Sequence, residues 1–221
     1  MYGLIDWLLD LLYPPKCMFC GTFVESTEHP LCGKCALDLP EFDGPLKTVP
    51  YFEKVVAPFY YEEPVRDAVL RFKFRGMTPY APLFAKWIAV WVRDKLDGEY
   101  DLISWVPCSP YRKWTRGYDQ AEVLAKALAA ELGTEVVGTL KKIKHNRQQS
   151  KTRDASRRRA NVLGAYCPLQ PEQIAGKRIL LVDDVLTTGA TLSECGKTLR
   201  LAGSGELVCA VLAVTRLEIK E

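Results

Sequence analysis

The segment from Leu180 to Thr191, LLVDDVLTTGAT, constrains the fold of this chain more than any other segment. It begins as an apolar run typical of a buried strand and ends in a threonine- and glycine-rich turn at the start of a helical pattern. Between them stand two adjacent acids, Asp183 and Asp184. In open α/β sheets, ligands bind at the carboxyl ends of the strands. The segment therefore predicts an α/β domain with a ligand site at this turn.

The same alternation of strand and helix extends over most of the chain. Apolar runs predict strands at residues 55–61, 100–107, 176–184 and 206–215. Helical patterns with glycine at or near their ends predict helices at residues 64–76, 80–96, 121–132 and 190–203. Residues 108–120 are expected to form a polar loop, with Asp119 capping the helix that follows. This order favours a mainly parallel central sheet.

Four of the eight cysteines form two C-x2-C pairs near the start of the chain. CMFC and CGKC are separated by eleven residues and contain Cys17, Cys20, Cys32 and Cys35. Two such pairs bring four thiolates to one tetrahedral ion, so the spacing predicts a closed, structural zinc site rather than a catalytic one. The other cysteines are scattered through apolar segments, which is typical of reduced thiols in a cytoplasmic protein.

The N-terminal segment and a proline-rich link set the expected domain boundary. Residues 1–13 place apolar side chains at helical spacing, and they lack the features of a signal peptide and the length to span a bilayer. This helix either packs on its own domain or makes weak contact with a membrane surface or a partner. We expect a zinc-binding domain at residues 1–45 and an α/β domain at residues 46–221.

The chemistry of the opening segment indicates a sugar phosphate. Backbone N–H groups at the start of a helix and nearby hydroxyls suit a phosphate, and here the turn consists of Thr187, Thr188, Gly189, Ala190 and Thr191. Carboxylates repel a phosphate, so Asp183 and Asp184 are expected to accept hydrogen bonds from sugar hydroxyls or to help hold Mg²⁺. The segment therefore predicts a ribose-5-phosphate site.

Positive charge is concentrated between residues 141 and 160, where nine basic residues accompany one acid. Three interpretations stay open: a loop that closes over an anionic ligand, a surface for single-stranded nucleic acid, and a solvated basic face. The side chains expected to make such contacts are Arg147, Lys151, Arg153, Arg157 and Arg158.

LLVDDVLTTGAT resembles the signature of type I phosphoribosyltransferases along its whole length. The resemblance implies that Asp183 and Asp184 are catalytic residues that meet the ribose hydroxyls, that the TTGAT turn holds the 5′-phosphate, and that the ligand is phosphoribosyl pyrophosphate (PRPP) with Mg²⁺. It also implies that the segment after an earlier strand binds pyrophosphate, which assigns that role to Arg112, Lys113 and Arg116. A solvated basic turn is the alternative for these three residues.

Two further stretches narrow the resemblance to one family. The chain resembles the ComF (competence protein F) family over nearly its whole length. The stretches that carry this resemblance are WVPCSPYRKWTRGYDQAEVLAKALA, RQQSKTRDASRRRANVLGAY and the PPKCMFCG start. This implies a type I phosphoribosyltransferase-like fold behind a zinc ribbon or knuckle, and a PRPP-binding protein involved in DNA uptake. An active phosphoribosyltransferase of nucleotide metabolism and a non-enzymatic adaptor that binds single-stranded DNA or competence proteins are the alternatives. Turnover, the acceptor and self-association stay open.

Overall fold

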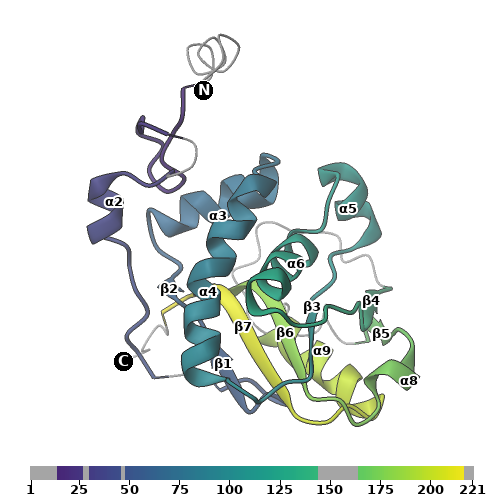
Figure 1. Ribbon diagram of the computed structural model, residues 1–221. Coiled ribbons are helices and arrows are strands. Elements are labelled where there is room, and N and C mark those ends of the chain that lie inside the picture. Colours follow the sequence, from purple (N-terminus) through teal and green to yellow (C-terminus); the bar gives the residue numbers. More distant parts are fainter. Residues whose placement is uncertain (1–13, 27–29, 46–47, 144–163, 217–221) are drawn as a thin grey trace, which may run out of the picture.

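A parallel β-sheet forms the centre of the computed structural model, which describes residues 14–26, 30–45, 48–143 and 164–216 (Figure 1). The strands run in the order β1-β7-β6-β3, and β2 also pairs with β7. All of these pairings are parallel, as the sequence predicts. The strands are β1 (Lys54–Val56), β2 (Phe59–Tyr60), β3 (Leu102–Trp105), β6 (Ile179–Leu186) and β7 (Leu207–Val214).

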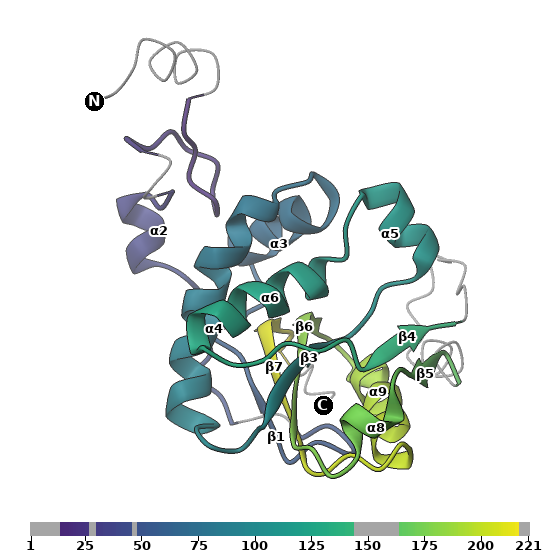
Figure 2. The ribbon, with the colours of Figure 1, turned by 45° about the vertical axis from the view of Figure 1, so that its right-hand side comes forward.

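Helices cover both faces of this sheet (Figure 2). Apolar side chains of β6 alternate between two core clusters, since Leu180 and Val182 belong to one and Ile179 and Leu181 to the other. The first cluster contains residues of α3 (Val65–Phe74), α4 (Ala81–Lys95) and α6 (Gln120–Leu132). The second contains residues of α8 (Pro171–Ile174) and α9 (Ala190–Leu201). Burial on both faces explains why β7 is apolar throughout.

The structure corrects two local predictions from the sequence. Residues expected to form a polar loop contain the helix α5 (Pro110–Arg116), because Ser109 caps its first turn and Gly117 ends it with φ of 81°. The strand expected to end at Asp184 continues to Leu186, so both acids lie inside β6. Asp119 caps α6, as predicted, by accepting hydrogen bonds from the backbone N–H groups of residues 121 and 122.

A short antiparallel hairpin was not predicted. Its strands are β4 (Leu140–Lys142) and β5 (Tyr166–Pro168), and a 3₁₀ turn, η1 (Thr78–Tyr80), precedes α4. Residues 144–163 connect the two strands of the hairpin and lie outside the described residues. The contacts expected from Arg147, Lys151, Arg153, Arg157 and Arg158 therefore also lie outside them.

The zinc-binding segment packs directly on the α/β domain through its first knuckle. Phe19 is fully buried, and its ring lies edge-on to Phe59 and Trp87, with centroids 6.1 and 5.4 Å away. The Arg71 guanidinium of α3 donates to the carbonyl of Met18 at 2.8 Å. The segment also contains the short helix α2 (Gly33–Leu37). The knuckle is thus part of the main hydrophobic core.

Residues 1–13 lie outside the described residues, so the expected N-terminal helix and its membrane contact are not addressed by the structure. Among the residues that the structure describes, no helix is both long enough and apolar enough to cross a membrane.

Candidate functional site

Four thiols converge at the N-terminal knuckles. The sulfur atoms of Cys17, Cys20, Cys32 and Cys35 all lie within 4.8 Å of one another. Zinc–thiolate bonds of about 2.3 Å in a tetrahedron require sulfur–sulfur separations of about 3.8 Å, so the four side chains fit this ion. The backbone N–H of Cys35 points at the Cys32 sulfur at 3.4 Å, which orients this side chain toward the other three. The arrangement has four protein ligands and is a structural zinc site.

A separate cavity of about 260 Å³ opens at the carboxyl ends of β3 and β6. It is the position at which open α/β sheets bind ligands. Its lining side chains come from both halves of the α/β domain and are largely polar. They are Tyr61, Lys73, Val106, Pro107, Cys108, Arg112, Gln120, Lys142, Tyr166, Asp183, Asp184, Val185, Thr187 and Thr191.

The two adjacent acids line this cavity in different environments. Asp184 is 3% exposed and forms an ion pair of 2.6 Å with Lys73 of α3. Among the described residues no cation forms an ion pair with Asp183; its carboxylate accepts a hydrogen bond of 2.8 Å from the backbone N–H of Asp184. Successive side chains of a strand point to opposite faces, so one acid lies on the side of α3 and the other on the side of Tyr166 and Cys195.

The different surroundings of the two acids affect the pKa values of the ionisable groups in the cavity. Burial, followed by the neighbouring Asp184 carboxylate, raises the pKa of Asp183 to about 8. Burial alone would lower the pKa of Lys73, but the Asp184 carboxylate outweighs it, and the pKa of Lys73 lies above its ordinary value. The cavity thus holds a stable ion pair next to a carboxyl group that is poorly stabilised as an anion. Raised carboxyl pKa values of this kind are frequent at functional sites.

The turn after β6 leads from the acids into α9. Thr187 and Thr191 line the cavity, while Gly189 has φ of 74°, in the left-handed region that favours glycine. The backbone N–H of Ala190 points at the hydroxyl of Thr188 at 3.4 Å. The start of a twelve-residue helix thereby faces the same cavity as the carboxylates. Backbone N–H groups at such a position suit an anion.

The three basic residues of α5 differ in their surroundings. Arg112 lines the cavity. Lys113 pairs with Glu122 of α6 at 2.7 Å, and Arg116 donates to Gln120 at 2.8 Å. Arg116 also lies over the ring of Phe74, 4.6 Å from its centroid. Of the three, only Arg112 belongs to the cavity lining.

Several lining residues were not predicted from the sequence to belong to a ligand site. Lys73 lies in the predicted helix that forms α3, and Lys142 and Tyr166 come from the unpredicted hairpin. The Lys142 ammonium donates to the Tyr166 hydroxyl at 3.0 Å, and burial together with the charge of Arg112 lowers the pKa of Lys142. Lys142 lies in the basic run of residues 141–160, but no local pattern marks Lys73 or Tyr166, which reach the cavity from elements distant in the sequence.

Comparisons with known proteins agree with this geometry. A family model described as phosphoribosyl transferase domain matches residues 119–219, and one described as double zinc ribbon domain matches residues 8–46. The chain is therefore a double zinc ribbon domain followed by a domain with the phosphoribosyltransferase fold.

Curated relatives identify the family. Competence protein F of Haemophilus influenzae is 32% identical over 86% of this chain and 86% of its own length. Competence protein ComFC of Streptococcus pneumoniae is 30% identical over 68% of this chain and 64% of its own length. DNA utilization protein YhgH of Salmonella typhimurium is 28% identical over 85% of this chain and 79% of its own length. The chain belongs to the competence protein F (ComF) family.

Proposed function

We propose that this protein binds PRPP together with Mg²⁺ in the cavity at the end of β6. The observation that carries the proposal is the shared lining: two adjacent carboxylates and the hydroxyls of the turn into α9 face one space. In this proposal Asp183 and Asp184 accept hydrogen bonds from the ribose hydroxyls. The 5′-phosphate is bound by Thr187, Thr188, Gly189, Ala190 and Thr191.

The other end of the ligand is assigned to the cationic wall. Arg112 binds the pyrophosphate group, because it is the α5 cation that lines the cavity. Lys113 and Arg116 lie on the same helix, where Lys113 pairs with Glu122 and Arg116 donates to Gln120. In this proposal they too bind the pyrophosphate group. Oxygen donors predominate over the single thiol of Cys108, so the cavity suits the hard ion Mg²⁺, which would supply positive charge to the pyrophosphate.

If the site turns over, the C1–O bond of PRPP breaks as a nucleophile attacks C1, and the bonding electrons leave with pyrophosphate. Arg112 then stabilises a charge that grows in the transition state. The carboxylates hold the ribose in place while positive charge develops at C1. The Lys73 ammonium, 2.6 Å from the Asp184 carboxylate, holds this side chain in position to accept a hydroxyl hydrogen bond.

The names of the relatives support a role in DNA uptake during natural transformation. The relatives are called competence protein F, competence protein ComFC and DNA utilization protein. We propose that this chain acts in the cytoplasm with proteins of the competence machinery. We also propose a domain boundary between residues 45 and 46, consistent with the zinc ribbon match at residues 8–46.

Thermal unfolding tests the ligand assignment. PRPP with Mg²⁺ should raise the melting temperature of the wild type, and the doubly substituted protein with Asp183→Ala and Asp184→Ala should lack this shift. An equal shift in the double variant would refute the site. Pyrophosphate release from PRPP, assayed against a panel of bases and amines, then decides between enzyme and ligand sensor.

A second candidate function is an adaptor that binds single-stranded DNA. It is favoured by α5, where the rings of Trp114 and Tyr111 are 82% and 60% exposed beside Arg112 and Lys113. Exposed aromatic faces next to cations are typical platforms for unpaired bases. Trp114→Ala should then weaken the binding of an oligothymidine by about tenfold, from a loss of 1–3 kcal/mol per stacked base. Unchanged oligothymidine binding in this variant would remove the platform from consideration.

A further inference from the structure

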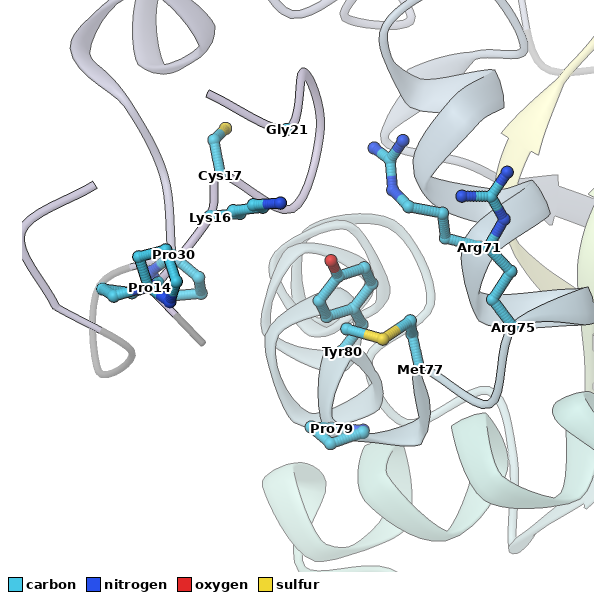
Figure 3. A pocket seen from close by; sticks show the side chains of 11 residues that line it. Pro14, Lys16, Cys17, Gly21, Pro30, Arg71, Arg75, Met77, Pro79 and Tyr80 are labelled. Carbon is cyan, nitrogen blue, oxygen red and sulfur yellow. The ribbon is translucent and has the colours of Figure 1, made fainter. Parts of the chain in front are cut away.

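A second and larger cavity, of about 450 Å³, lies where the zinc ribbon meets the α/β domain. One wall comes from the ribbon around Lys16, and the opposite wall comes from α3 and η1 (Figure 3). It shares no lining residue with the cavity at the end of β6. Its volume lies within the range of about 300–1,000 Å³ that is usual for ligand sites, and junctions between domains are frequent positions for them.

The lining combines rigid apolar surface with positive charge. Four prolines, Met77 and Tyr80 supply the apolar part. Three cations, Lys16, Arg71 and Arg75, also line the cavity, and none of the described lining residues is acidic. Buried or clustered cations are normally matched by anions, so a lining of one sign favours an anionic ligand.

Two of these cations are available to a ligand. Arg71 is held in place, because its guanidinium donates to the carbonyl of Met18. Arg75 is exposed, and within the described part of the chain no carboxylate pairs with it. Lys16 lies over the exposed ring of Phe23, 5.4 Å from its centroid, and has no acidic partner among the described residues. Lys16 and Arg75 therefore present positive charge from opposite walls (Figure 3).

We propose that this cavity binds an acidic peptide segment of a partner protein. An apolar side chain of the peptide lies against the prolines and Met77, and carboxylates on either side of it meet Lys16 and Arg75. The opposed position of the cations matches separated carboxylates better than a single phosphate group (Figure 3). A nucleic acid fits less well, because the exposed ring of Phe23 lies outside the lining, and the aromatic ring among the described lining residues, that of Tyr80, is 8% exposed and packs edge-on against Phe84.

The geometry of α3 keeps the two cavities separable in an experiment. Arg71 and Arg75 are four residues apart, so they share one face of the helix. Lys73 points elsewhere and pairs with Asp184. A substitution at Arg75 therefore changes the junction cavity without removing the ion pair of the other site.

The test uses the full chain and fluorescence anisotropy of a short labelled peptide built of glutamate, leucine and tryptophan. We expect saturable binding by the wild type. Charge reversal by Arg75→Glu or Lys16→Glu should weaken it by about tenfold or more, since like charges in an interface cost several kcal/mol. Lys86→Glu, on the exposed face of α4, is the matched control and should bind as the wild type does.

Three results of this peptide-binding experiment would contradict the proposed acidic-peptide site. No saturable peptide binding by the wild type would overturn it, and so would equal affinities for the wild type and Arg75→Glu. Competition between an oligothymidine and the peptide, with the same sensitivity to Arg75→Glu, would assign the cavity to nucleic acid instead. PRPP binding, measured in parallel by thermal shift, should be the same in wild type and Arg75→Glu, so this test is independent of the proposed function.

Discussion

Substituting the two adjacent acids should change the stability of the ligand-free protein in opposite directions. Asp183→Asn removes a carboxyl group whose pKa is raised to about 8, while the amide oxygen can still accept the backbone N–H of residue 184 at 2.8 Å. Asp184→Asn instead removes the partner of Lys73, which is 2.6 Å away and only 24% exposed. Neither substitution changes the size of the side chain appreciably, so charge is the main difference.

The magnitudes follow from the protonation of the site. A carboxyl group with a pKa near 4 in the unfolded chain and about 8 in the folded one binds more protons when folded, so its presence lowers the unfolding free energy as pH rises between these values. At about 1.4 kcal/mol per pKa unit, the penalty at pH 7 reaches about 4 kcal/mol, which Asp183→Asn removes. Loss of the Lys73 partner should cost about 2 kcal/mol, below the 3–5 kcal/mol of fully buried pairs.

Urea unfolding of wild type and both variants, without PRPP or Mg²⁺, measures these differences. The advantage of Asp183→Asn over the wild type should be small at pH 5, grow towards pH 8 and level off above it. Asp184→Asn should unfold at lower urea concentration than the wild type at pH 7. If Asp183→Asn is less stable than the wild type at pH 8, or if the difference in stability does not depend on pH, the Asp183 carboxyl does not destabilise the folded chain as an anion.

Three further predictions concern the zinc site and the ligand-binding residues. Removal of zinc by a chelator should lower the melting temperature of the whole chain, because the knuckle residue Phe19 is part of the main core; a main transition at the original temperature would contradict this. Arg112→Ala should weaken PRPP binding by about tenfold or more in calorimetry, whereas Lys113→Ala should change it by about twofold. A larger loss in Lys113→Ala than in Arg112→Ala would show that Lys113 is the main contact of the pyrophosphate. Gly189→Val should lower the unfolding free energy, measured in urea, by about 1–3 kcal/mol, because φ at this residue is 74°. It should also weaken PRPP binding. Wild-type values of both quantities would show that the turn tolerates a branched side chain.

The sequence predicted the central architecture because its determinants are local. A strand buried on both faces must be apolar along its length, so β6 and β7 were recognisable without knowledge of their neighbours. The zinc site was equally predictable, because each C-x2-C pair forms one knuckle and the spacing brings the two pairs together. The helix start at Asp119 was predicted from its own side chain.

The parts that were missed depend on contacts between distant segments or on competing local patterns. The ion pair of Lys73 with Asp184 joins residues from α3 and β6, and nothing near Lys73 marks it as a cavity residue. The β4–β5 hairpin has only three residues in each strand and a long connection, so it has no clear period in the sequence. In α5, the many polar residues suggested a loop, although Ser109 before Pro110 and a glycine at the end are helix boundaries.

Calorimetric titration of Mg²⁺ and PRPP into the wild type and into Asp183→Asn measures whether the carboxylates at the end of β6 bind the ribose of PRPP. Since Asp183→Asn is expected to be more stable than the wild type, a loss of binding in this variant cannot be attributed to unfolding. We predict saturable binding of about one PRPP per chain to the wild type and at least about tenfold weaker binding to Asp183→Asn. Equal affinities of the two proteins, or no binding by the wild type, would show that the carboxylates at the end of β6 do not bind the ribose of PRPP.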